Sequence, residues 1–172
     1  MARKGYADGF VTYGQVIASK GLKDRMLAKL GDFLDRFVYG DGPLFPKDAP
    51  LHQPNCGVVA MCMLTDAGYD AVVDILGRDF NERWIGGTYR HQYGPCAAEL
   101  GHKVTINNAP KGTLTTLCEE TAKTKERVFA TVFGHAVVVW DGLIFDQSFP
   151  AGATPAEHPC RNDRLMFTMT RD

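Results

Sequence analysis

Several features that would point directly to a class of protein are absent from this sequence of 172 residues. No stretch approaches the roughly 18 uninterrupted apolar residues of a membrane-spanning helix, so we expect no membrane partner. The first ten residues carry two positive charges but lead into no apolar segment, which argues against a signal peptide. Nineteen basic residues stand against twenty acidic ones, and this balance gives no overall basic excess for binding nucleic acid.

The cysteines also lack a recognisable pairing. There are five, an odd number, and no CxxC spacing occurs among them. This pattern argues against both a disulfide framework and a structural zinc site, so the sequence predicts no metal and no cofactor. Reduced thiols are typical of the cytosol, and we therefore expect a cytoplasmic protein.

What the sequence does contain is typical of a globular chain. Hydrophobic residues make up 45% and charged residues 23%, which excludes an intrinsically disordered chain. The length suits one domain with an additional N-terminal arm. We expect residues 1–40 to form a helical arm and residues 41–172 to form the main domain.

The arm contains one strongly amphipathic segment at residues 23–38. Its apolar residues recur with helical spacing: Met26, Leu27, Leu30, Phe33, Leu34, Phe37 and Val38. Because this stripe is too large to leave in water, we expect the helix to dock on the body of its own chain. Two alternatives remain open: a detachable segment that covers a cleft, or an interface through which two copies form a homodimer.

In the main domain, predicted helices come before predicted strands. A proline-rich loop at residues 40–55 leads into an apolar run at residues 56–68, which predicts a buried helix with Asn55 as its N-cap and Gly68 as its stop. Further helices are expected at residues 69–76, 95–100 and 114–122. Strands are expected at residues 127–133, 135–140, 143–147 and 164–170. This order predicts an α+β fold with antiparallel strands.

Cys56 lies at the expected N-terminus of the buried helix. Free backbone N–H groups and the helix dipole stabilise a thiolate at such a position, and the same N–H groups can bind a developing oxyanion. The ordinary alternative is that this cysteine is a small buried residue of the core. The position alone therefore makes Cys56 a candidate nucleophile without deciding the question.

The Asp141-Gly142 dipeptide brings a histidine and an aspartate together. If it forms a two-residue hairpin turn, Val137 pairs with Asp146 and His135 with Ser148. His135 and Asp146 then share one face as diagonal neighbours, and the carboxylate can fix the tautomer of the imidazole. Either residue alone could be structural, but an unpaired charge on an apolar hairpin would be costly.

Three short motifs follow one another in the chain: Gln53-Pro-Asn-Cys56-Gly57 before the apolar helix, Gly134-His135-Ala-Val-Val-Val in a strand, and Asp-Gly-Leu-Ile-Phe-Asp146 after it. In this order and context, residues 51–150 resemble papain-like cysteine peptidases, most closely the C39-like, bacteriocin-processing peptidases. The resemblance implies a papain-like α+β fold, with an N-terminal helical part packed on a small antiparallel sheet.

The resemblance also implies a role for each matching residue. Cys56 would be the nucleophile, His135 the general acid and base, and Asp146 the residue that orients the histidine. Such peptidases usually carry an oxyanion-hole glutamine several residues before the nucleophile. This sequence departs from that pattern, because its glutamine, Gln53, lies only three residues before Cys56. Asn55 or a backbone N–H group is the alternative for this role.

The expected activity is that of a thiol hydrolase that cleaves a peptide or isopeptide bond in a protein or peptide substrate. The same triad supports deamidation or transglutaminase-type acyl transfer, because only the leaving group and the acceptor differ. A third alternative is an inactive papain-like module that binds a protein partner. Such a module would not need a reactive thiol at Cys56, so thiol reactivity separates it from the enzymes.

Overall fold

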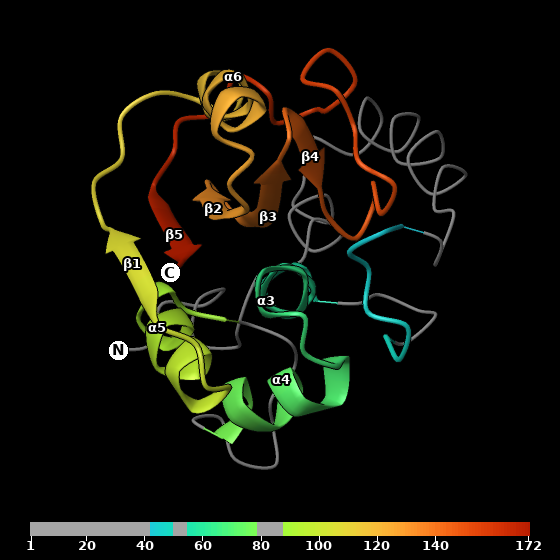
Figure 1. The fold of residues 1–172 in the computed structure, drawn as a ribbon, viewed down its shortest axis with the longest axis vertical. Helices are drawn as coiled ribbons and strands as arrows, with labels where there is room; N and C mark the ends of the chain where they lie inside the picture. The colour runs from blue at the N-terminus through green and yellow to red at the C-terminus, as the bar shows by residue number, and fades with distance from the viewer. Residues whose placement is uncertain (1–41, 50–54, 79–87) are drawn as a thin grey trace, which may run out of the picture.

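The computed structural model describes residues 42–49, 55–78 and 88–172 (Figure 1). In these ranges the chain has an α+β architecture built on a five-stranded antiparallel sheet with the order β1-β5-β2-β3-β4. The helices are α3 (Cys56–Thr65), α4 (Tyr69–Leu76), α5 (Arg90–Glu99) and α6 (Leu114–Thr124). The strands are β1 (Val104–Asn107), β2 (Val128–Val132), β3 (His135–Trp140), β4 (Leu143–Phe145) and β5 (Phe167–Arg171).

Helices cover both faces of the central strands, so the fold has three layers (Figure 1). On one face α3 packs against β3, β2 and β5, and on the other α6 packs against β3 and β4. Successive residues of β3 therefore enter different cores: Ala136 and Val138 lie on the α3 side, and Val137 and Val139 lie on the α6 side. Burial on both sides explains why β3 is almost continuously apolar instead of alternating with polar residues.

Helix α3 is the buried centre of the larger core. Every residue from 57 to 65 is buried, and Asn55 caps the helix as predicted. The predicted end at Gly68 is wrong, because the helix stops at Thr65 and Asp66 adopts a left-handed conformation with φ of 61°. Aspartate tolerates this conformation better than most residues, so a glycine is not needed there. Gly68 instead serves as the N-cap of α4, whose predicted bounds are confirmed.

Helix α5 is longer than predicted. It starts at Arg90, five residues before the expected position, and it contains Pro95 in its interior. The sequence reading treated this proline as a helix start, which is its commonest helical position. The first turn is instead closed by Gln92, whose side-chain oxygen accepts a hydrogen bond from Tyr89 N at 2.7 Å. The Gln92 amide also donates to Leu76 O at 3.2 Å and so ties α5 to α4.

All four predicted strands are present. Strand β3 has the predicted bounds, whereas β2, β4 and β5 each omit residues at one or both predicted ends. Strand β1 was not predicted; it has four residues, most of them exposed, and it pairs with β5 at the edge of the sheet. Its sequence, Val-Thr-Ile-Asn, alternates apolar and polar residues, but four residues are the shortest run in which such alternation indicates a strand.

The described part of the loop before α3 contains neither helix nor strand, as predicted. Its Asp48 carboxylate accepts hydrogen bonds from Tyr69 N at 2.8 Å and Asp70 N at 3.3 Å, and so caps α4 from a distance. Burial of Phe45 anchors the same loop in the core. The predicted arm and its helix at residues 23–38 lie outside the described residues.

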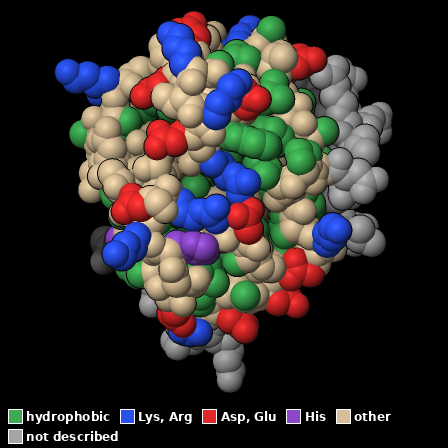
Figure 2. Space-filling view, in the orientation of Figure 1, with side chains coloured by type: hydrophobic (Ala, Val, Ile, Leu, Met, Phe, Trp, Pro, Cys, Tyr) green, Lys and Arg blue, Asp and Glu red, His purple; other side chains and the backbone are tan. Residues whose placement is uncertain are grey.

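The described residues also bear on two other questions, membrane-spanning helices and surface charge. No single helix among them is both long and apolar enough to cross a membrane, and α3 and α4 meet that test only as a pair bent by 119°. On the face seen in Figure 2, Lys and Arg side chains lie interspersed with Asp and Glu.

Candidate active site

Cys56 is the first residue of α3, and its side chain is partly exposed. The Asn55 side-chain oxygen accepts hydrogen bonds from Gly57 N at 2.9 Å and Val58 N at 3.3 Å, and Val59 N donates to the Asn55 carbonyl at 2.9 Å. The backbone N–H of Cys56 itself has no acceptor within the described part of the chain. A donor next to the thiol is where the oxyanion of an acyl-transfer reaction needs one.

Gly57 allows the start of α3 to pack closely against α5. A Cβ at this position would lie 2.1 Å from Thr88 Oγ1 and 2.8 Å from the Tyr93 hydroxyl oxygen. These two buried hydroxyls hydrogen-bond to each other at 2.7 Å. The position of Cys56 is therefore fixed by a tight contact that only glycine permits.

His135 is the first residue of β3 and follows a two-residue turn in which Gly134 has a φ of 74°. Its side chain is 20% exposed, and its Nε2 lies 2.6 Å from Asp146 Oδ2. The Cys56 side chain lies near the imidazole and contributes to the raised pKa of His135. Because Nε2 is engaged with the carboxylate, Nδ1 is the ring nitrogen left for the thiol.

Opposing effects act on the pKa of His135. Burial lowers it, but the hydrogen bonds and the charges of Asp146 and Cys56 outweigh burial and raise the pKa well above its ordinary value. The imidazolium form is therefore favoured at neutral pH. A protonated imidazole beside a thiol suits a residue that stabilises a thiolate and later donates a proton.

Asp146 is only 3% exposed, yet its carboxylate is fully hydrogen-bonded. Oδ1 accepts from Ser148 N at 2.7 Å and Phe149 N at 2.8 Å, while Oδ2 faces His135 Nε2 at 2.6 Å and His158 Nε2 at 3.2 Å. Burial raises the pKa of this carboxyl, but the two histidine contacts outweigh burial and hold the pKa well below its usual range. Asp146 is therefore a buried carboxylate anion.

The hairpin prediction is right at the turn and wrong beyond the strand. Asp141 and Gly142 both have positive φ, at 51° and 79°, as a type I′ turn requires. The ladder between β3 and β4 has three pairs and ends before Asp146, so the expected pairs of Val137 with Asp146 and His135 with Ser148 do not form. The chain turns at Asp146 instead, and this turn supplies the two backbone donors to its carboxylate.

His158 was missed by the sequence reading. It is completely buried, and its Nδ1 accepts a hydrogen bond from Cys160 N at 3.2 Å. Its hydrogen therefore lies on Nε2, which donates to Asp146. No periodicity marks this residue, because it lies in the irregular segment between β4 and β5.

Three of these side chains could in principle hold a metal ion. His135, Asp146 and His158 offer ligand atoms that all lie within 4.8 Å of one another. A metal on Nε2 of His158 would require the hydrogen on Nδ1, where it would face the N–H of Cys160. Two donors would then oppose each other, so the cluster fits a hydrogen-bonded chain better than a metal centre.

The other four thiols are poor candidates for a nucleophile. Cys62, Cys96 and Cys118 are buried, and Cys160 is partly buried. Burial raises the pKa of Cys96 to about 12 and the pKa values of Cys118 and Cys160 to about 11, and it raises that of Cys62 further still. Cys56 is the one cysteine of the five that contributes to the raised pKa of His135, whereas the charge of His135 acts on Cys160 without outweighing its burial.

Of the two residues predicted to bind the oxyanion, the structure describes Asn55 but not Gln53. Gln53 lies outside the described residues. Asn55 lies next to Cys56, but its side-chain oxygen is committed to capping α3, so only its amide nitrogen is left to bind an oxyanion.

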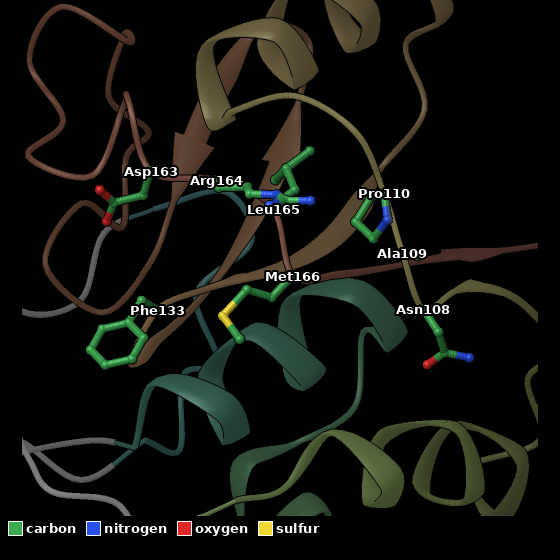
Figure 3. Close-up of a pocket in the computed structure, with 8 residues that line it drawn as sticks. All are labelled: Asn108, Ala109, Pro110, Phe133, Asp163, Arg164, Leu165 and Met166. Atoms are coloured by element: carbon green, nitrogen blue, oxygen red, sulfur yellow. The ribbon is translucent and has the colours of Figure 1, made fainter.

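An open apolar cavity of about 490 Å³ adjoins the turn before His135 (Figure 3). Phe133, which is 80% exposed, and Met166, which is 47% exposed, contribute much of its apolar lining. The two lie on neighbouring segments, because Met166 N donates to Thr131 O at 2.9 Å. Along the chain only Gly134 separates Phe133 from His135, but His135 itself does not line this cavity.

Comparisons with known proteins add no further assignment: no family model, no curated protein and no solved structure gives a significant match to this chain.

Proposed function

We propose that this protein is a papain-like, C39-like thiol hydrolase that cleaves a peptide or isopeptide bond. The proposal is carried by one observation: the His135 imidazole is hydrogen-bonded to the buried carboxylate of Asp146 and lies near enough to Cys56 for that side chain to raise its pKa. The resemblance of the three motifs and their order in the chain agree with it.

Acyl transfer at this site would proceed in two steps. The Cys56 thiolate attacks the amide carbonyl carbon, an S–C bond forms, and the carbonyl π electrons move to the oxygen. When the C–N bond breaks, His135 gives its proton to the leaving amine, and a thioester remains. Water then attacks the thioester, His135 takes the water proton, and the C–S bond breaks to give a carboxylic acid and the thiolate.

The oxyanion formed in each step needs donors close to Cys56. The backbone N–H of Cys56 is the first candidate, because the Asn55 cap occupies the N–H groups of Gly57 and Val58 but leaves this one. The amide group of Gln53 or Asn55 would supply the second donor. One such donor contributes about 10²–10³ in rate in the best-studied case.

The proposed compartment and partner follow from the same chemistry. All five cysteines are free thiols, which agrees with a reducing compartment such as the cytoplasm. The partner in the reaction is a protein or peptide substrate that presents an amide bond to Cys56.

Incubation with a mixture of synthetic peptides tests the activity, with mass spectrometry of the products and of the intact protein. Hydrolysis gives two shorter peptides and a thioester adduct on Cys56 during turnover. Deamidation of glutamine or amide exchange with an added amine would instead identify the acyl-transfer alternatives. Cys56→Ala should abolish any of these activities, and Cys118→Ala, a buried thiol, is the matched control.

A binding module would give a different result. It would form no adduct on Cys56 and change none of the peptides, although it could still retain a protein partner. An unchanged peptide mixture together with an unreactive Cys56 would therefore overturn the proposed activity.

A further inference from the structure

His158 is a buried, hydrogen-bonded histidine that the steps of acyl transfer do not use. It is fully buried, whereas His135 is 20% exposed. Its ring lies 6.4 Å from that of His135 with an interplanar angle of 17°, and 5.1 Å from the ring of Phe149. Burial of a polar ring in so confined a place is costly unless its nitrogens have partners, and here both have one.

The hydrogen bonds of His158 have a fixed direction. Cys160 N can only donate, so Nδ1 of His158 accepts and Nε2 carries the hydrogen. Nε2 therefore donates to Asp146 Oδ2, the same oxygen that His135 contacts. The chain of donors runs from Cys160 N through His158 to the carboxylate.

The carboxylate would be incompletely satisfied without this bond. Two backbone N–H groups occupy Oδ1 of Asp146, and two histidines share Oδ2. A carboxylate has about four acceptor positions, and at 3% exposure water offers little substitute for a lost donor. A buried anion that loses one of its donors is destabilised relative to the protonated acid.

We propose that His158 is a positioning residue that holds Asp146 ionised and directed at His135 by donating a hydrogen bond to Oδ2. The inference rests on the proposed function, in which Asp146 orients the imidazole that activates Cys56. His158 makes no contact with the reacting atoms and acts through Asp146. The active-site histidine is thus supported by a second histidine that never exchanges a proton with substrate.

Two substitutions separate donation to Asp146 from the contact with Cys160. His158→Gln places an amide N–H near the position of Nε2 but offers no acceptor at the position of Nδ1. His158→Asn does the reverse, because its short side chain reaches the N–H of Cys160 and stops before Asp146. The readout is the rate at which iodoacetamide alkylates Cys56 at neutral pH, in variants whose thermal unfolding shows them to be folded.

We expect the Gln variant to stay within about threefold of the native rate and the Asn variant to lose about tenfold or more, as for a lost hydrogen bond to a charged group. Equal rates in the two variants, or a slower Gln variant, would overturn the inference. If Cys56 of the native protein reacts no faster than the buried thiols, the proposed function fails, and that failure is seen before the variants are compared.

A measurement on the native protein keeps the inference testable if either variant fails to fold. Nitrogen-15 NMR of labelled histidine distinguishes a ring nitrogen that carries hydrogen from one that does not. We expect His158 to show a bare Nδ1 and a protonated Nε2. A hydrogen on Nδ1 with a bare Nε2 would remove the donor to Asp146 and contradict the inference.

Discussion

An aspartate that binds two basic side chains lies near each end of helix α3, in opposite environments. At the C-terminal end, the Asp66 side chain is 55% exposed and pairs with Arg127 at 2.5 Å and Arg171 at 2.8 Å. Near the N-terminal end, Asp146 is 3% exposed and pairs with His135 and His158. The same kind of cluster is thus solvated at one end and buried at the other.

Much of this difference comes from the basic side chains, which are arginines around Asp66 and histidines around Asp146. Arginine stays charged at every accessible pH, so the Asp66 cluster can only bind and cap, and Arg127 Nη1 also donates to Met63 O at 2.7 Å near the helix end. Histidine can give or take a proton near neutral pH, so the Asp146 cluster can take part in chemistry. Burial makes its hydrogen bonds stronger and the loss of any of them more costly.

The largest expected effect comes from removing the charge of Asp146. Asp146→Asn should lower turnover by about 10⁴, the loss measured when the orienting aspartate of a serine protease becomes asparagine and favours the wrong tautomer. Asp66→Asn is the matched control, because it removes a doubly paired aspartate at the other end of α3. Peptide turnover by both variants is the measurement, and near-native turnover by Asp146→Asn would show that Asp146 does not orient His135.

A smaller effect is expected from the tight packing at the start of α3. Gly57→Ala should destabilise the protein by about 1–3 kcal/mol, because its new methyl group overlaps Thr88 Oγ1 and forces a shift. Gly94→Ala is the control, since its methyl group would meet only the end of the Ile106 side chain. Urea unfolding of both variants checks this, and equal stabilities would mean that the start of α3 is not tightly packed.

The pH dependence of turnover should change when Asp146 is substituted and stay the same when Asp66 is substituted. In the proposed reaction His135 must be protonated to release the amine, and although burial lowers its pKa, the effects of Asp146 and Cys56 raise it above the ordinary value of 6.5. Turnover should therefore persist above pH 6.5 and fall as pH rises through the raised pKa. In Asp146→Asn the decline should move to lower pH, whereas in Asp66→Asn it should stay in place.

Asp146 has a lower pKa in the folded protein than in the unfolded chain, and this difference decides how the free energy of unfolding changes in acid. Its contribution to stability is present above about pH 4 and is lost as pH falls toward the lower, folded value. The free energy of unfolding of the native protein should therefore decrease below about pH 4, and Asp146→Asn should show less of that decrease. Equal acid dependence in the two proteins would contradict a carboxylate held ionised by its four donors.

The smallest effect is expected at the exposed end of α3. Asp66→Asn should cost about 1 kcal/mol or less, because its ion pairs are largely solvated and the asparagine keeps the tolerance for positive φ. Asp74→Asn on the exposed surface of α4 is the control. Thermal unfolding at low and high salt checks the ion pairs. A loss of stability as large as that of Gly57→Ala would mean that the C-terminal end of α3 is as sensitive to substitution as its tightly packed start.

The sequence allowed the local features of the site to be predicted, and the reason is local geometry. The Asn55 cap and the Asp141-Gly142 turn each depend on residues within three positions of one another. These two signals placed Cys56 at a helix start and His135 near Asp146. The alternation of the hairpin identified the pair correctly even though the ladder ends before Asp146.

What could not be predicted depends on contacts between distant parts of the chain. His158 approaches Asp146 through an irregular segment, and no spacing in the sequence indicates that contact. Helix α5 is tied to α4 by the Gln92 amide, which donates to the distant Leu76 O, and no pattern in the sequence indicates that contact. Edge strand β1 pairs with β5, a segment far along the chain, and its own four residues do not identify that partner.

The most direct test of the central claim is competition among the five thiols for a limiting amount of iodoacetamide in the folded protein near neutral pH. Mass spectrometry of the digested protein locates the adduct. We expect Cys56 to be modified first, because it is partly exposed, lies at the start of α3 and adjoins the His135 imidazole, and we expect His135→Ala to remove its advantage. Modification of Cys118 or Cys160 before Cys56 would contradict the assignment of the nucleophile.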